Sequence, residues 1–324
     1  MVRLWGRGDR WGWLGLLLSL ACLVWLGYTT DWAGVGMALA HLDVRLLAAA
    51  TALNLASIPA RTARWRLMLR GHGGSAFGQL TAALLIGQSV NVLAPAPLGD
   101  LARAALSGTG EVAYALGTLV VETVLDLCML VALALGLLSL AAWPIGWQGA
   151  VQAFLAASGL ALAVVATVAI ARRGVARRLE GLAARWTRPW LQRLAAAFVQ
   201  LLSSLGILGR PAQVAPVLAW SVLIWALYVA VNYALLGAVG QRPSLITAGF
   251  LLAVLQVGVA VPSSPGRIGV YHLLCVQALR AWGVQEATAL AYALVLHLIS
   301  VLLPMALGVA LAWRWRHGGG WITC

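Results

Sequence analysis

Two long apolar segments of this chain run into clusters of proline and glycine where a membrane helix would have to continue. Residues 91–100 read NVLAPAPLGD, and residues 261–269 read VPSSPGRIG. Proline has no N–H to donate and its ring clashes with the preceding turn, so neither segment can remain one unbroken helix. Irregular backbone at membrane depth persists only where protein or a water-filled cavity satisfies its polar groups. The two breaks therefore predict an internal site at membrane depth.

The composition is that of an all-α polytopic membrane protein. Of the 324 residues, 62% are hydrophobic and 10% are charged, whereas a soluble domain carries about a quarter charged residues. We expect one transmembrane domain over residues 1–324, with its first apolar stretch retained as a span because no small-residue cleavage site follows it. Six stretches approach the length and apolarity of a full span: 11–28, 44–60, 111–142, 148–171, 212–238 and 286–313.

Two further apolar segments end at the breaks. Each is followed by a short helical stretch, so we expect two re-entrant elements that leave the membrane on the side where they entered. Three spans, an odd number, separate these elements, which predicts an inverted repeat with halves at about 77–142 and 245–313. The segments before the breaks are 77–96 and 245–262, and the short helices after them are about 98–107 and 270–282.

The breaks align with each other residue by residue. Matching Pro95 to Pro262 also matches Gly99 to Gly266, and each glycine precedes a charged residue. Glycine permits backbone geometry or a close approach that a side chain would block. The residues expected to act as structural hinges are Pro95, Pro97, Gly99, Pro262, Pro265, Gly266 and Gly269.

Arginine alone supplies the 22 basic residues, and its distribution predicts the orientation. With both termini in the cytoplasm, seventeen arginines fall inside, four fall outside and Arg103 lies on the first re-entrant element, which follows the positive-inside rule. The basic stretches 61–70 and 172–193 mix arginine with tryptophan and suit interfacial helices on an anionic inner leaflet. Simple topogenic anchoring is the alternative for both. Nucleic-acid binding is not expected, since the arginines flank spans.

Two carboxylates lie in the middle of the span 111–142. Glu122 and Asp126 are four residues apart and share one helix face. Because an ionisable side chain is costly at the bilayer centre, we expect protonation or a cationic partner. Arg103 and Arg267, next to the two breaks, are the candidate partners. The group either binds substrate or fixes helix packing.

Polar residues beside the breaks complete the candidate site. Asn91 and Gln88 either bind a headgroup or satisfy backbone groups freed by the prolines, and Asp100 suits the N-cap of the next helix. His272 and His297 flank the second break and could share a proton-sensitive site, or each could be hydrogen-bonded separately.

Enzymatic motifs are missing from the sequence. It contains no GxSxG, HExxH, P-loop or dinucleotide fingerprint. The four cysteines form no CxxC or Cys/His cluster, so no metal site and no cofactor are expected. An intramembrane acid pair can still perform acid–base chemistry, so an enzyme stays an alternative.

The motifs in this order resemble the transmembrane region of lysylphosphatidylglycerol synthases, a flippase-like family. The matching residues are Arg61, Arg64 and Trp65; Asn91, Pro95, Gly99, Asp100 and Arg103; Glu122 and Asp126; Pro265, Gly266 and Gly269; and Pro304 and Gly308. The resemblance implies two re-entrant elements in a protein that moves lipids between leaflets. The family's soluble aminoacyl-transferring domain has no counterpart in this sequence, so that activity is not expected.

Four positions depart from the family pattern. The family usually has Glu at the position of Asp100, Arg at Thr123, Glu at His272 and Arg at His297. The last two changes replace a Glu/Arg pair by two histidines, so the headgroup chemistry is expected to differ.

We therefore expect a flippase-like lipid transporter of the plasma membrane. Its substrate would carry a charged or sugar-bearing headgroup, bound between the tips of the re-entrant elements. The alternatives are an intramembrane enzyme and a lipid-binding partner of an enzyme that acts on lipid-linked substrates. The sequence leaves the oligomeric state open, a homo-oligomer included. The residues expected to bind substrate are Asn91, Asp100, Arg103, Glu122, Asp126, Arg267, His272 and His297.

The expected orientation can be tested by labelling. Single cysteines at positions 145 and 241, in a chain without its four native cysteines, should react with an impermeant reagent added to whole cells. A cysteine at position 180 should stay unlabelled, because the arginine-rich loop 172–193 that contains it is expected on the cytoplasmic side. Labelling at 180 would reverse the assignment.

Overall fold

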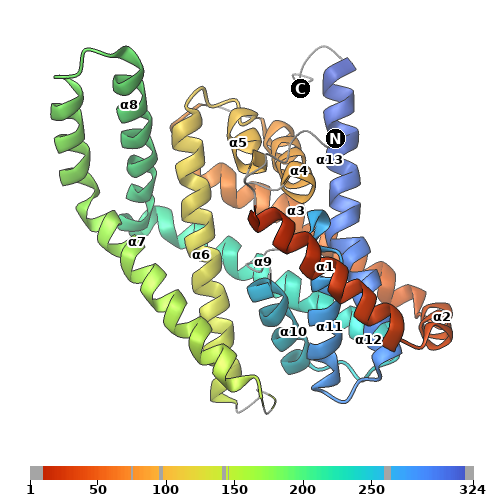
Figure 1. The fold of residues 1–324 in the computed structure, drawn as a ribbon. Coiled ribbons are helices and arrows are strands. Elements are labelled where there is room, and N and C mark those ends of the chain that lie inside the picture. Colours follow the sequence, from red (N-terminus) through yellow and green to blue (C-terminus); the bar gives the residue numbers. More distant parts are fainter. Residues whose placement is uncertain are drawn as a thin grey trace.

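The computed structural model describes residues 10–73, 76–94, 98–140, 144, 146–258 and 264–317, with side chains from residue 16. Every element in these ranges is helical, which confirms the all-α class (Figure 1). The helices are α1 (Arg10–Thr29), α2 (Trp32–Ala40), α3 (Val44–Met68), α4 (Phe77–Leu93), α5 (Leu98–Ala105), α6 (Val112–Ser139), α7 (Gln148–Ala183), α8 (Pro189–Ser204), η2 (Leu205–Gly209), α9 (Pro211–Ala238), α10 (Leu245–Gly258), η3 (Pro265–Arg267), α11 (Val270–Arg280), α12 (Glu286–His297), η4 (Leu298–Leu302) and α13 (Leu303–His317).

Within the described residues, five helices are long and apolar enough to cross a membrane. They span 112–139, 148–183, 189–209, 211–238 and 286–317. A sixth is obtained if α1 and α2, which meet at 87°, count as one bent span. Four of the expected spans reappear with shifted ends, and the first reappears only as part of this bent pair.

One expectation about the basic stretches is wrong, and the expected surface position of 172–193 stays a prediction. Residues 61–68 are the last turns of α3, in which Arg64 and Trp65 are 1% and 0% exposed, so this stretch does not lie on the membrane surface. Residues 172–183 continue α7, and the chain then turns back into α8. The region 189–209 was not expected as a span. Helix α3 is long enough for a span but is not among the five, because its arginines lower its mean hydropathy.

Helices α3 and α9 form the centre of the fold. They run side by side through the middle of the molecule with the most extensive contact of any helix pair (Figure 1). In the view of Figure 1, α4 and α5 lie above this pair, and α10 and α11 lie below it. The hairpin of α7 and α8 stands at one edge.

At the first break, α5 folds back along α4, and glycines set their separation. A methyl group on Gly99 would collide with the Gly87 carbonyl oxygen and the Asn91 side chain. The Asn91 amide oxygen also accepts a hydrogen bond from Gly99 N at 2.8 Å. The short helix expected after this break is therefore present. Pro95 and Pro97 lie outside the described residues.

The second break has unusual backbone geometry. Gly266 and Gly269 have φ of +73° and +94°, and Arg267 between them has φ of +58°. This left-handed region suits glycine and disfavours other residues. Pro265 begins η3, and the short helix expected after this break is α11. Pro262 lies outside the described residues.

A later helix of each half packs against the helix that precedes the break of the other half. Helix α13 contacts α4, and α6 contacts α10. At the first of these contacts Ser89 Oγ donates to Met305 O at 3.0 Å, and a methyl group on Gly308 would collide with the Leu85 carbonyl oxygen. This reciprocal packing accords with two related halves, while the inverted repeat and the re-entrant course stay predictions.

The close contact at Gly99 predicts that a methyl group added there lowers the stability of the protein. Gly99→Ala should destabilise the protein by about 1–3 kcal/mol, because a rigid backbone must move. Gly136→Ala is the control, since the space beside Gly136 on α6 is open, and alanine there should be neutral or stabilising. Thermal unfolding in detergent measures both. Equal midpoints would show that α4 and α5 can separate without cost.

Candidate functional site

A buried group of ion pairs joins four helices at the centre of the molecule. Arg64 on α3 lies 2.6 Å from Asp126 and 3.0 Å from Glu122, nitrogen to oxygen. Arg103 on α5 lies 2.8 Å from the second oxygen of Glu122. Ser221 on α9 accepts from the Arg64 guanidinium at 3.0 Å. Glu122 therefore bridges two arginines, and Arg64 bridges both carboxylates.

Aromatic side chains enclose this group. The guanidinium of Arg103 lies 4.2 Å from the centroid of the Trp65 ring, a cation–π distance. The Trp65 indole N–H donates to Thr118 Oγ1 at 3.0 Å, which fixes the ring. Trp225 on α9 donates to Asp126 Oδ1 at 3.3 Å. The side chain of Asp126 is 36% exposed against 8% for Glu122, so the group is more open at Asp126.

A third arginine adds uncompensated positive charge. Arg61 lies one turn before Arg64 on α3, and its Nη1 donates to Gln88 Oε1 at 3.1 Å. Since Gln88 is neutral, three guanidiniums of this region face two carboxylates. The Nε atoms of Arg64 and Arg103 are also buried, without a hydrogen-bond partner among the described residues. We call Arg61, Arg64, Arg103, Glu122 and Asp126 the arginine network.

The polar residues at the first break bind each other. The Asn91 side-chain nitrogen donates to Asp100 Oδ1 at 3.0 Å, while the Asn91 side-chain oxygen accepts from Gly99 N. Asn91 thus satisfies backbone at the break, as one of its two expected roles required. The expected N-cap is wrong, because α5 already begins at Leu98 and Asp100 lies in its first turn. A negative charge there still favours the helix dipole.

The two histidines meet at the second break. Their ring centroids are 5.0 Å apart, and both side chains are buried. His297 Nε2 lies 2.8 Å from the Gly266 carbonyl oxygen, and His272 Nδ1 accepts from Gly269 N at 3.4 Å. Both rings therefore hold the left-handed backbone in place.

Arg267 does not join the arginine network. Its backbone is in η3, its side chain is exposed, and no ion pair of the described residues connects it to either carboxylate. The tips of the breaks nevertheless approach each other, since a methyl group on Gly266 would lie 4.0 Å from Val92 at the end of α4. Arg64 occupies the position that we had expected Arg267 to take.

The sequence does contain a signal for Arg64. Asn54, Ser57, Arg61 and Arg64 recur at intervals of three and four residues, which places them on one face of α3. Asn54 and Ser57 are also buried. A polar stripe on a helix within an apolar chain faces the bundle interior. The stripe was missed because arginine beside tryptophan also suits a membrane surface.

The helical fold and the paired buried charges define a multi-pass membrane protein with a polar centre. Residues 12–308 match the family described as the lysylphosphatidylglycerol synthase TM region, and the chain belongs to that family. This match confirms the resemblance that the motifs indicated.

One curated relative gives a more specific comparison. Glycosyltransferase AglD of Haloferax volcanii is 28% identical, over 91% of this chain and 53% of the relative. The chain therefore spans about half the length of the curated relative that it matches. No solved structure matches the chain.

The arginine network predicts a specific pattern of stability. Arg64→Met should destabilise the protein by about 3–5 kcal/mol, because it leaves buried carboxylate charge without its partner. Adding Asp126→Asn should recover part of that loss, since the neutral amide is cheaper to bury. Thermal unfolding in detergent compares the single and the double variant.

The control is Arg66→Met on the same helix, since the Arg66 side chain is exposed and outside the network. It should leave the unfolding midpoint almost unchanged. Strictly additive losses in the Arg64/Asp126 pair would show that the two side chains act independently.

Proposed function

We propose that this protein moves a lipid with an anionic headgroup between membrane leaflets, and that the arginine network binds the headgroup. The observation that carries this proposal is the excess of positive charge in the arginine network. Three guanidiniums face two carboxylates, and two buried N–H groups have no acceptor among the described residues.

An anionic group is the ligand that this arrangement suits. Buried charges need partners, and a buried N–H without an acceptor costs about 1–3 kcal/mol. A phosphate would supply both the missing negative charge and oxygen acceptors. Arginine is the preferred residue for such an ion, because its planar fork donates two parallel hydrogen bonds. Arg61 is the best placed to bind, because its hydrogen-bond partner among the described residues is the neutral Gln88 amide.

The two breaks give the headgroup a route through the bilayer. Gly266 and Val92 bring their tips together, and each break carries polar side chains. Asn91 and Asp100 lie on the first break, and His272 and His297 on the second. Polar groups at membrane depth between two interrupted helices are typical of a transporter's substrate site. Arg267 would guide the headgroup at the exposed edge of the second break.

The family description and the fold agree with a lipid substrate. The description of the family names a lipid synthase, and the chain is a multi-pass membrane protein. The proposed location is the plasma membrane, and the arginine distribution favours both termini in the cytoplasm. The sequence contains no nucleotide-binding motif, so transport would be passive or coupled to an ion.

A second function is favoured by the relative. The name of glycosyltransferase AglD indicates sugar transfer in that protein. By analogy, this chain would position a lipid-linked substrate for sugar transfer, and the arginine network would then hold the lipid phosphate without moving it across the bilayer. Lipid binding without translocation would distinguish this function from the first.

The excess charge can be removed without breaking an ion pair. Arg61→Gln should lower translocation of a fluorescent phosphatidylglycerol in proteoliposomes at least fivefold, because the network then has no spare cation. Arg61→Lys should retain more activity, since it keeps the charge and loses only the planar fork. Arg45→Gln is the control, because Arg45 is exposed at the start of the same helix.

The readout is the fraction of lipid that an external quencher can reach over time. Unfolding midpoints of the purified variants exclude a loss of fold. Wild-type translocation by Arg61→Gln would remove the excess charge from the mechanism.

A further inference from the structure

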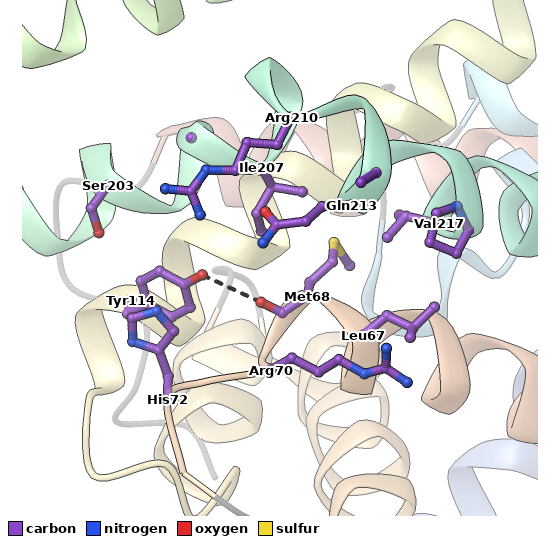
Figure 2. A pocket seen from close by; sticks show the side chains of 13 residues that line it. Leu67, Met68, Arg70, His72, Tyr114, Ser203, Ile207, Arg210, Gln213 and Val217 are labelled. Atoms are coloured by element: carbon purple, nitrogen blue, oxygen red, sulfur yellow. Dashed lines mark hydrogen bonds between the residues drawn. The ribbon is translucent and has the colours of Figure 1, made fainter.

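A polar cavity lies outside the arginine network. It has a volume of about 280 Å³ and opens where the end of α3 meets α6, η2 and the start of α9 (Figure 2). Figure 2 shows Arg210 and Gln213 along one wall, His72 and Tyr114 along another, and Arg70 beside Leu67 on a third. We call this cavity the basic pocket.

The basic pocket carries positive charge that the protein does not neutralise. The guanidiniums of Arg70 and Arg210 and the amide of Gln213 have no hydrogen-bonded or ionic partner among the described residues. The adjacent acid is Glu111, which lies outside the lining, and its carboxylate is 2.9 Å from His72 Nδ1. None of the described residues that line the pocket is acidic.

The wall between these charges is ordered by specific contacts. His72 stacks on Tyr114 with ring centroids 3.5 Å apart, and Tyr114 Oη donates to Met68 O at 3.3 Å. Tyr114 is 6% exposed. The pocket is therefore shaped by packed side chains, while the two arginines at its mouth are exposed.

The surroundings suit an amphiphile. A second hollow of about 640 Å³ shares Leu67 and Arg70 with the basic pocket. Apart from these two, it is lined mainly by apolar residues, Leu69, Phe77, Leu80 and Trp220 among them, with Arg66 as a further cation. The two adjoining hollows therefore combine a small cationic space, the basic pocket, with a larger and mostly apolar space.

We propose that the basic pocket binds a phosphate monoester, with Arg70 and Arg210 as its main ligands and Gln213 as a neutral donor. Guanidiniums bind phosphate oxygens through parallel hydrogen bonds. The start of α9 adds to the attraction, because its N-cap is Arg210, which offers no side-chain acceptor to the first turn. The ester is either the headgroup of a lipid such as phosphatidic acid or a soluble phosphate ester.

This site is separate from the proposed transport route. Its ligands lie outside the arginine network, and its test measures binding in detergent and not translocation. The pocket would stand if the protein moved no lipid, and transport would stand if the pocket bound nothing.

The test uses the purified full-length protein in a neutral detergent. Glycerol 3-phosphate serves as the soluble probe and dioctanoyl phosphatidic acid as the lipid probe, with affinities from titration calorimetry. Arg70→Gln with Arg210→Gln should weaken binding at least twentyfold. Arg185→Gln with Arg188→Gln is the matched control, because it removes two exposed arginines from the turn between α7 and α8, and it should stay within twofold of the wild type.

A variant with unchanged charge provides a second measurement. Ser203→Trp should fill the basic pocket, since Ser203 lines it and is exposed, and it should also abolish binding. Binding of the lipid alone would assign the pocket to a headgroup, and equal binding of both probes would assign it to the phosphate itself. The proposal is overturned if the wild type binds neither probe saturably, or if the pocket variants bind as tightly as the control.

Discussion

The contact of Arg64 with Glu122 and Asp126 is the interaction on which the rest of the structure depends. A carboxylate inside an apolar bundle is stable only beside a positive charge. Arg64 provides this charge from α3, which itself packs along α9 through the middle of the fold. The same guanidinium bonds to Ser221 on α9. One side chain thus fixes the relative position of three helices, and the fully buried Trp65 beside it leaves little room for another arrangement.

The ion pairs and the breaks are physically connected. Arg103 is on α5, the short helix that follows the first break, so its bond to Glu122 ties that helix to α6. Asn91 and the glycine contact tie the other side of α5 to α4. At the second break, His297 on α12 and His272 on α11 hydrogen-bond to the backbone of Gly266 and Gly269. The interrupted backbone is therefore supported by an ion pair and an amide at the first break, and by two imidazole rings at the second.

The sequence predicted much of the fold and part of the site. Hydropathy located α6, α7, α9 and the last helix, and the proline–glycine clusters located both breaks. Arg103 and Glu122 were expected to pair because costly charges at membrane depth need partners, and they do. Arg64 was assigned to the membrane surface, because periodicity defines a helix face but not the neighbour that covers it. Helix α8 was missed because its first residues share the arginine-rich composition of the preceding turn.

Helix α4 touches its neighbours backbone to backbone on two sides. Gly87 and Gly99 bring α5 against one side, and Gly308 brings α13 against another. Contacts of this kind leave no side-chain layer in which one helix could slide or rotate past the next. The proposed transport would require a change of conformation, and these contacts predict that α4, α5 and α13 would move in it together as one rigid body. The hinges for such a rocking motion must lie at the ends of these helices, where the chain enters and leaves the unit.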